Sequence, residues 1–250
     1  MEKKVWYIAG ASRGLGLALI DKLLSAGHRV ASASASAVKP ISNDFLPLQV
    51  DPSDEISIET SVADTWTTFG RIDVVVNAMP SMSVDLFAPV TVIKKVMPYL
   101  RTQGHGHIIN MSSISGVTDK SIYDASKTAL IAMSDNLAQD TRALGIRVTA
   151  VIPGAFRTQF LGQDPMVLPP SRVRYLSIDG RQPGDPVKAA AALMQIATMP
   201  EPPALLVLGS DAYTHATAKM AEFSEQVTHS THGIVAFSRG RRENIRLSLW

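Results

Sequence analysis

The stretch AGASRGLG, residues 9–16, stands between a short apolar run, Val5–Ala9, and a longer segment with the apolar spacing of a helix. A glycine turn at the carboxyl end of a strand lets the backbone approach a phosphate, and the helix that follows offers unpaired N–H groups and its positive dipole end. Strand, glycine turn and helix in this order favour nucleotide binding over a purely structural turn. The candidate contacts in this stretch are Gly10, Ser12, Arg13, Gly14, Leu15 and Gly16.

Outward from this unit, short apolar runs alternate with longer helical patterns, which is typical of parallel strands covered by helices on both faces. The predicted strands are Val5–Ala9, Arg29–Ala33, Leu46–Val50, Ile72–Val76, His107–Met111, Arg147–Val151 and Ala204–Leu208. The predicted helices are Leu15–Ser25, Ile56–Thr68, Asp85–Leu100, Tyr123–Leu144 and Pro186–Ala197. We therefore predict one α/β domain over residues 1–250, a doubly wound (Rossmann) seven-stranded parallel sheet. Within it we expect a cofactor half at about 1–150, a substrate loop at about 155–185 and a C-terminal tail at about 229–250.

The composition narrows the classes of function. The chain has 250 residues, 46% of them hydrophobic, and a net charge of only +2, so it can bury a large core and does not call for a nucleic-acid partner. It has no cysteine, which excludes disulfides and thiolate chemistry and fits a reducing, cytoplasmic location. The six histidines lack the spacing of metal ligands, so no metal is expected. No apolar run is long enough to predict a membrane span or a signal peptide.

The end of the second strand bears on the choice of dinucleotide. A carboxylate there would accept a hydrogen bond from the ribose 2′-OH of NAD and repel a 2′-phosphate. This chain has Ser34 and Ala35 at that point, whereas Arg13 in the glycine turn could meet a 2′-phosphate. The sequence therefore favours NADP(H) as cofactor, with NAD(H) still open. Asp51, after the third strand, could accept a hydrogen bond from the adenine amino group.

The stretch SIYDASKTAL, residues 121–130, places Tyr123 four positions before Lys127. Side chains at this spacing lie on the same face of a helix, so the ammonium could sit beside the phenol. A phenol that titrates near 10 is a poor proton donor or acceptor at neutral pH, and a nearby cation favours its charged form. Taken alone, this spacing fits two exposed surface residues as well as a catalytic pair.

An ordered series of short motifs extends over nearly the whole chain. The series consists of AGASRGLG, VDPSD, IDVVVNA, HIINMSSISG, YDASK and IPGAFRT. In this order and at the ends of predicted strands, it resembles the short-chain dehydrogenase/reductase family, specifically its NADP-type members related to hydroxysteroid and ketone reductases. The resemblance implies an oxidoreductase that interconverts a carbonyl and a secondary alcohol by hydride transfer.

The resemblance also assigns roles to individual residues. Tyr123 would be the general acid in reduction and the general base in oxidation, and Lys127 would lower its pKa and hold the nicotinamide ribose. Ser113 would hydrogen-bond the substrate oxygen, with Ser112 as a rival for that role. Asp85 stands where the family carries a catalytic asparagine. The remaining cofactor contacts implied by the family motifs are Asn77, Pro153, Gly154 and Thr158.

The chain departs from the family pattern at four points. Ala9 replaces a threonine, and the family's asparagine, alanine and glycine after Asn77 are here Ala78, Met79 and Pro80. Asp85 replaces the asparagine named above, and the interval from Ser113 to Tyr123 is shorter than in the family. An alternative therefore stays open: a short-chain dehydrogenase scaffold repurposed for NADP(H) sensing or for non-redox chemistry.

Substrate and partners are expected from the later part of the chain. The long proline-rich loop between the sixth and seventh strands could hold a hydrophobic carbonyl or alcohol, or its apolar residues could only pack the loop. Those residues are Phe156, Phe160, Met166, Leu168 and Tyr175. The resemblance implies a homodimer or homotetramer through the helices near Asp85–Leu100 and Tyr123–Leu144. The four arginines of the tail could dock on an acidic surface or remain solvated; they are Arg239, Arg241, Arg242 and Arg246.

Overall fold

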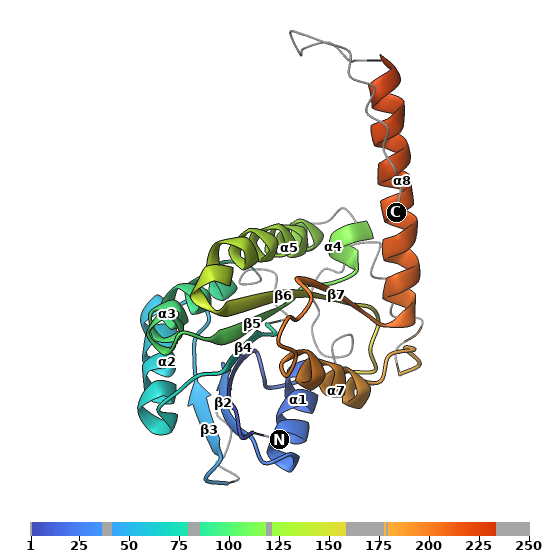
Figure 1. Cartoon of the computed structure of the whole chain (residues 1–250). Helices are drawn as coiled ribbons and strands as arrows, with labels where there is room; N and C mark the ends of the chain where they lie inside the picture. The colour runs from blue at the N-terminus through green and yellow to red at the C-terminus, as the bar shows by residue number, and fades with distance from the viewer. Residues whose placement is uncertain are drawn as a thin grey trace.

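A computed structural model describes residues 2–36, 42–79, 86–118, 122–158, 178 and 180–233. Seven parallel strands form one sheet in the order β3-β2-β1-β4-β5-β6-β7, which confirms the predicted doubly wound fold (Figure 1). The strands are β1 (Val5–Ala9), β2 (Arg29–Ser34), β3 (Phe45–Gln49), β4 (Val74–Asn77), β5 (Gly106–Met111), β6 (Ile146–Pro153) and β7 (Leu205–Leu208). The helices are α1 (Gly14–Ser25), α2 (Glu55–Phe69), α3 (Phe87–Gln103), α4 (Ser115–Thr118), α5 (Ile122–Thr141), α7 (Pro186–Ile196) and α8 (Ser210–Gly233), with a 3₁₀ turn η1 (Arg142–Leu144).

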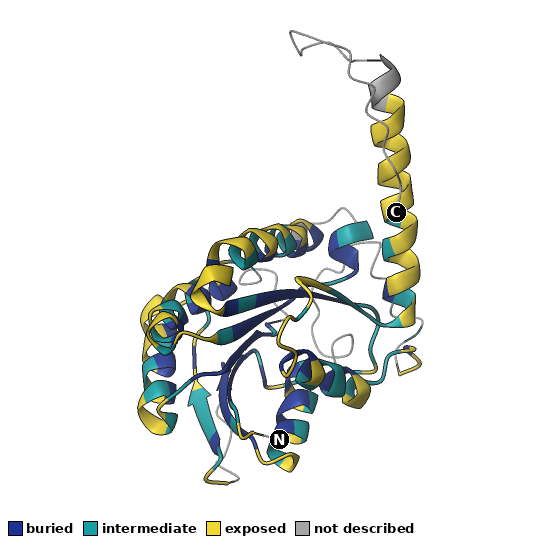
Figure 2. Cartoon of the chain, in the orientation of Figure 1, coloured by how far each residue is buried: buried dark blue, intermediate teal, exposed yellow. Residues whose placement is uncertain are grey.

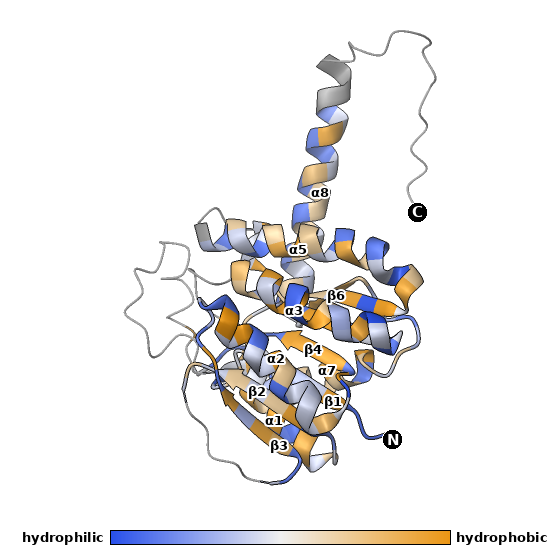
Figure 3. Cartoon of the chain, turned by 90° about the vertical axis from the view of Figure 1, so that its left-hand side faces the viewer, coloured by the Kyte–Doolittle hydropathy of each residue, from blue (hydrophilic) through white to orange (hydrophobic). Residues whose placement is uncertain are grey.

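The strands are apolar at successive positions because the sheet is buried on both faces. In β1, Tyr7 packs into a cluster with α2 and α3, whereas its neighbours Trp6 and Ile8 pack into a second cluster with α1 and α7. The polar and apolar alternation of a half-exposed strand is therefore missing from β1, and both sides of the sheet contribute to the core. Figure 3 shows this as orange strands between helices whose outer faces are mixed in colour.

The strand order reverses beside β1. The chain runs from β1 outward to β2 and β3, then returns to β4 on the other side of β1, and Ala9 is paired with both Ala33 and Asn77. In a sheet wound this way the connections after β1 and β4 leave in opposite directions, and a crevice opens at the carboxyl ends of these strands. The topology therefore puts the glycine turn after β1 at the edge of that crevice.

The amino ends of the strands are closed by polar side chains. Asp73 accepts a hydrogen bond from the Val5 N–H at 2.8 Å, and its other oxygen accepts from Arg71 Nη2 at 2.6 Å and lies 3.2 Å from His105 Nε2. Thr149 gives its hydroxyl hydrogen to the Pro203 carbonyl, so the 2.8 Å contact between His107 Nε2 and Thr149 Oγ1 has the histidine as donor. At this edge, opposite the crevice, the polar groups named here are thus satisfied within the protein.

The five predicted helices are present, and their first and last residues differ from the predicted ones by only a few positions. The helix predicted from Asp85 has its N-cap at Leu86 and begins at Phe87, while Asp85 itself lies outside the described residues. The helix predicted to reach Leu144 is α-helical to Thr141 and ends in a 3₁₀ turn.

Two helices, α4 and α8, were not predicted. The second projects from the body, and Figure 2 shows most of it exposed; it also occupies residues 229–233, where the sequence analysis places the start of a tail. Among the described helices, none is apolar enough over the required length to cross a membrane.

Candidate active site

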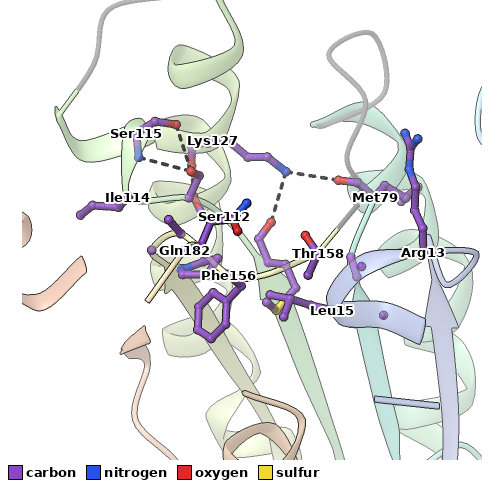
Figure 4. A pocket seen from close by; sticks show the side chains of 18 of the residues that line it. Arg13, Leu15, Met79, Ser112, Ile114, Ser115, Lys127, Phe156, Thr158 and Gln182 are labelled. Carbon is purple, nitrogen blue, oxygen red and sulfur yellow. Dashed lines mark hydrogen bonds between the residues drawn. The ribbon is translucent and has the colours of Figure 1, made fainter. Parts of the chain in front are cut away.

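A pocket opens at the carboxyl ends of β1, β4, β5 and β6, and most of the predicted site residues line it (Figure 4). The predicted residues that line the pocket belong to three groups. They are Arg13, Gly14, Leu15 and Gly16 of the glycine turn; Ser113, Tyr123 and Lys127 of the proposed catalytic group; and Pro153, Gly154 and Thr158 of the segment after β6. Residues more than a hundred positions apart in sequence therefore share one cavity, as the crossover topology requires.

The glycine turn is shaped by close backbone contacts. A Cβ on Gly10, whose φ is +85°, would lie 2.6 Å from Met79 Cα, and a Cβ on Gly16 would lie 2.8 Å from the Gly10 carbonyl oxygen. The first turn of α1 is thereby held against the ends of β1 and β4. Within the described residues, the N-cap residue Arg13 makes no side-chain capping bond, so the first N–H groups of α1 remain at the pocket wall. This backbone cradle fits the phosphate groups of a dinucleotide.

The predicted contacts on the adenosine side lie around this turn but outside the pocket itself. Ser12 is exposed, and Ser34 is buried and donates its hydroxyl hydrogen to the Ser36 carbonyl at 2.9 Å. Asp51 is exposed, and one of its oxygens accepts bonds from the hydroxyl and the N–H of Ser53 at 2.7 and 2.8 Å. The Ser53 hydroxyl and N–H hold the pKa of the Asp51 carboxyl below its usual range. None of these three residues is among those that line the described pocket.

Tyr123 and Lys127 lie on the first turns of α5, and both are buried, with 5% and 3% of their surface exposed. Lys127 Nζ is 5.6 Å from the centre of the Tyr123 ring. The same ammonium donates to the carbonyl oxygen of Met111, at the end of β5, at 3.2 Å, and to that of Met79, just after β4, at 3.4 Å (Figure 4). The ends of two strands thus fix the cation beside the phenol, as the spacing of four residues predicts.

The two adjacent serines after β5 differ in what their hydroxyl groups contact. Ser112 Oγ donates to the Lys127 carbonyl at 2.8 Å, so its hydrogen is committed to the backbone of α5. Ser113 Oγ lies 2.9 Å from Ser115 Oγ, and these two hydroxyl groups share their hydrogen bond at the pocket wall. This arrangement favours Ser113 over Ser112 as the hydroxyl that faces a ligand. It also brings in Ser115, which the sequence analysis did not single out.

The short connection from Ser113 to Tyr123 contains the helix α4. A Cβ on Gly116 would lie 2.8 Å from Lys127 Cβ, and Thr128 Oγ1 donates to the Gly116 carbonyl. Because Gly116 has no side chain, α4 packs directly against α5, and the pocket still includes both Ser113 and Tyr123.

The departures around β4 are partly compensated by backbone contacts. The Ala78 N–H donates to the Ala9 carbonyl at 2.8 Å, which links the first and fourth strands where the family's threonine hydroxyl is missing. Asn77 does not line the described pocket; its side chain is buried and donates to Asn110 Oδ1 at 2.8 Å, and Asn110 in turn donates to Ser134 on α5. In this structure Asn77 therefore connects β4 to β5.

The segment after β6 forms another wall of the pocket and reaches the glycine turn. Thr158 Cβ would lie 3.9 Å from a Cβ on Gly14, so this segment crosses the start of α1. The Ala155 N–H donates to Asp211 Oδ2 at 2.7 Å, and Phe156 is bridged to Gly184. Phe156 lines the pocket as predicted, whereas four other apolar candidates lie outside the described residues; these are Phe160, Met166, Leu168 and Tyr175.

Several pocket residues were not predicted as site residues. They include Met79, Met111 and Gln182 in the lining, and Asp211 behind it. Among the described residues, no group of three or more His, Asp or Glu side chains is arranged to hold a metal ion.

Comparison with known proteins identifies the family. The family model for short chain dehydrogenase matches residues 4–165. Oxidoreductase BOA17 of Botryotinia fuckeliana is 33% identical over 88% of this chain and 93% of its own, and 3-ketodihydrosphingosine reductase of Bacteroides thetaiotaomicron is 32% identical over 64% of this chain and 66% of its own. A crystal structure of a short-chain dehydrogenase from Streptomyces avermitilis superposes with a TM-score of 0.80 at 27% identity, covering 92% of this chain and 97% of that one. The chain belongs to the short-chain dehydrogenase family of oxidoreductases.

Proposed function

We propose that this chain is an NADP(H)-dependent oxidoreductase that interconverts a carbonyl and a secondary alcohol, with Tyr123 as the general acid and base. The observation that carries the proposal is the shared pocket of Tyr123, Lys127, Ser113 and the glycine turn of α1. Membership of the short-chain dehydrogenase family supports the reaction type, and one relative is named as a reductase of a keto compound.

The chemistry divides between the cofactor and the chain. A bound nicotinamide supplies the hydride in reduction and accepts it in oxidation. In the reductive direction the Tyr123 hydroxyl donates its proton to the carbonyl oxygen, and in the oxidative direction the phenolate takes the proton of the alcohol. The Lys127 ammonium, 5.6 Å from the Tyr123 ring centre, stabilises the phenolate electrostatically. Ser113 donates a hydrogen bond to the substrate oxygen and orients it toward Tyr123.

The chain offers distinct groups for the parts of the dinucleotide. The first N–H groups of α1 and the close approach permitted by Gly10 and Gly16 suit the diphosphate. Arg13, at the pocket wall, is our candidate for the 2′-phosphate of NADP(H), because a guanidinium pairs well with phosphate oxygens. Pro153, Gly154 and Thr158, which line the pocket, are our candidates for the nicotinamide side.

The pocket wall suggests the kind of substrate. Ile114 and Phe156 contribute apolar side chains to this wall, with Gln182 beside them (Figure 4). We infer a small carbonyl or alcohol with a hydrophobic portion as the substrate, and a cytoplasmic homodimer or homotetramer as the working form.

The substitution Tyr123→Phe tests this function. It removes the proton donor and keeps the ring, so we expect kcat to fall by about 10²–10⁴-fold while the Kd for NADPH changes little. Turnover is followed by nicotinamide absorbance over a panel of ketones and alcohols, and Kd by fluorescence titration. The matched control is Tyr99→Phe, which changes a half-buried tyrosine on α3 that does not line the pocket.

Three results would contradict the proposal. Full turnover by Tyr123→Phe would remove the assigned role of Tyr123. Tight NADPH binding by the unmodified chain without turnover of any panel compound would favour a cofactor sensor. Binding of neither NADPH nor NADH would contradict both functions.

A further inference from the structure

A second serine contacts the one assigned to the substrate oxygen. Ser115, the first residue of α4, lines the pocket and is buried, with 6% of its surface exposed. Its hydroxyl oxygen lies 2.9 Å from Ser113 Oγ, and its backbone N–H donates to the same oxygen at 3.3 Å. Figure 4 shows both contacts as dashed lines from Ser115. Two polar groups of one residue therefore meet the single hydroxyl oxygen of Ser113.

The turn that carries the two serines is fixed by backbone hydrogen bonds. The Ile114 N–H, between them, donates to the Pro153 carbonyl at the end of β6 at 3.0 Å. The Gly116 N–H donates to the Ser113 carbonyl at 3.1 Å and closes the turn. The distance between the two serine hydroxyl groups is therefore set by the fold of the chain.

The hydrogen atoms of this pair can be counted. A serine hydroxyl donates one hydrogen bond and accepts up to two. Among the described residues, neither Ser113 Oγ nor Ser115 Oγ has a hydrogen-bond partner outside the pair. One hydroxyl hydrogen lies between the two oxygens. The other hydroxyl hydrogen therefore has no acceptor in the described part of the chain and is available to a ligand in the pocket.

The backbone contact indicates which hydrogen is available. If Ser115 donates its hydroxyl hydrogen, Ser113 Oγ accepts from both the hydroxyl and the N–H of Ser115, and both of its acceptor positions are filled. An oxygen that accepts hydrogen bonds becomes a better donor, because the connected bonds polarise one another. The N–H of Ser115 therefore favours Ser113 as the residue that donates into the pocket.

We propose that Ser115 is a positioning residue for Ser113: it fills the acceptor positions of the Ser113 hydroxyl, so that Ser113 meets the substrate oxygen only as a hydrogen-bond donor. The inference rests on the proposed function, in which Ser113 contacts that oxygen. In reduction, negative charge develops on the carbonyl oxygen. A donor already oriented toward this oxygen stabilises the transition state more than the bound ketone. Ser115 thus acts through Ser113.

The same orientation serves the oxidative direction. The oxygen of a bound alcohol accepts the hydrogen bond from Ser113 and carries one hydrogen of its own. Because the acceptor positions of Ser113 are filled, this hydrogen is left for the Tyr123 phenolate, the proposed general base. A Ser113 hydroxyl with an open acceptor position would compete with Tyr123 for it, and the resulting hydrogen bond would be unproductive.

A double-mutant cycle on Ser113 and Ser115 tests this role, with kcat and KM measured for a ketone that the unmodified chain reduces. Ser115→Ala removes the hydroxyl and keeps the backbone N–H. We expect kcat to fall about tenfold, with KM and the Kd for NADPH nearly unchanged. Ser113→Ala should lower kcat by about 10²–10³-fold, which single turnovers with enzyme in excess can follow. The double variant should have the kcat of Ser113→Ala, because the hydroxyl that Ser115 orients is gone.

Two further variants separate this role from a general loss of stability. Ser115→Cys keeps the shape of the side chain but offers only a weak donor, so it should lower kcat in the same way as Ser115→Ala. The matched control is Ser61→Ala, which removes a buried hydroxyl 2.7 Å from the Tyr7 hydroxyl, away from the residues that line the pocket. This control should lower the free energy of unfolding, measured in urea, and leave kcat unchanged.

Each other outcome overturns the inference. A further tenfold loss in the double variant would mean that Ser115 acts independently of Ser113. An unchanged kcat in Ser115→Ala and Ser115→Cys would mean that Ser113 needs no such partner, and a raised KM alone would make Ser115 a substrate contact. Full turnover by Ser113→Ala would remove the role of both serines. None of these results touches the reaction itself, which Tyr123→Phe tests, whereas a chain without any turnover would contradict the proposed function and this inference together.

Discussion

The two edges of the sheet are built differently although the same strands form both. At the carboxyl edge, glycines allow backbone segments to approach within contact distance, and the first N–H groups of α1 face a pocket. At the amino edge, Arg71 and His105 both contact Asp73, and His107 is bonded to Thr149. The two edges therefore differ: the first N–H groups of α1 remain available at the carboxyl edge, whereas these polar side chains of the amino edge are bonded within the chain. Substitutions at the amino edge should therefore change stability, and those at the carboxyl edge should change binding and turnover.

At the amino edge, the largest change in the free energy of unfolding is expected when the pH is lowered. Burial lowers the pKa of His107 from its ordinary 6.5 to about 4. Between these values the unfolded chain binds a proton that the folded chain does not, so stability is fully present above pH 6.5 and is lost as pH falls toward 4. Because one pKa unit corresponds to 1.36 kcal/mol, the loss approaches about 3 kcal/mol. Urea unfolding at several pH values measures it.

The variant His107→Gln isolates this contribution, because it keeps a neutral donor for Thr149 but cannot titrate. Its free energy of unfolding should depend less on pH between 6.5 and 4 than that of the unmodified chain. Desolvation also lowers the pKa of His28, so some dependence remains in the variant. The control His215→Gln, at an exposed position on α8, should keep the full dependence. If the free energies of unfolding of the unmodified chain and of His107→Gln changed equally with pH, His107 would not be the source of this pH dependence.

The next largest change in the free energy of unfolding is expected from the substitution Asp73→Ala. The substitution leaves the buried Val5 N–H without its acceptor and Arg71 without its closest carboxylate. We expect a loss of about 2 kcal/mol in the free energy of unfolding, below the cost for a fully buried ion pair, because Arg71 and His105 can turn toward water. The Kd for NADPH, measured on the folded protein, should stay unchanged.

The exposed Asp64 on α2 provides the control for this test. Asp64→Ala should change the free energy of unfolding, measured in urea, by less than about 0.5 kcal/mol. A loss of NADPH affinity in Asp73→Ala at full folding would mean that the two edges are coupled, and the comparison would then fail.

The smallest effect is expected at the carboxyl edge from Arg13→Gln. Loss of a guanidinium that pairs with the 2′-phosphate should weaken NADPH binding by about tenfold, or 1.4 kcal/mol, and leave NADH binding unchanged. Titration of both nucleotides measures this difference, with Arg101→Gln on the exposed end of α3 as control. Equal losses for NADPH and NADH would show that Arg13 does not read the 2′-phosphate.

Much of the sheet could be predicted because its signals are local. Each strand is an apolar run, and the first is followed by glycines that only a close backbone approach explains. The pair of Tyr123 and Lys127 was also predictable, since four residues along a helix is a fixed geometry. α8 was missed because its apolar residues are separated by many small and polar ones.

Other parts of the site depend on contacts across the fold. The sequence already favoured Ser113 over Ser112, and the structure adds that the Ser112 hydroxyl donates to the carbonyl of Lys127, a contact that no sequence spacing contains. Asn77 has the position of a cofactor residue in its motif, yet its side chain bonds to Asn110 on the neighbouring strand. Such outcomes depend on strand register, which is set by packing over the whole sheet.

The sequence by itself determined the order of strands and helices, the glycine turn and the phenol beside its lysine, because these follow from the periodicity and the conformational limits of neighbouring residues. Only the tertiary structure decided that Met79 and Met111 hold the lysine ammonium and that Asp211 holds the segment after β6. Each of those contacts joins a side chain to a backbone group of a distant segment, and every residue type except proline offers the same carbonyl and N–H. The residue type at these positions therefore does not reveal the contacts. They become visible only when the fold brings the distant segments together.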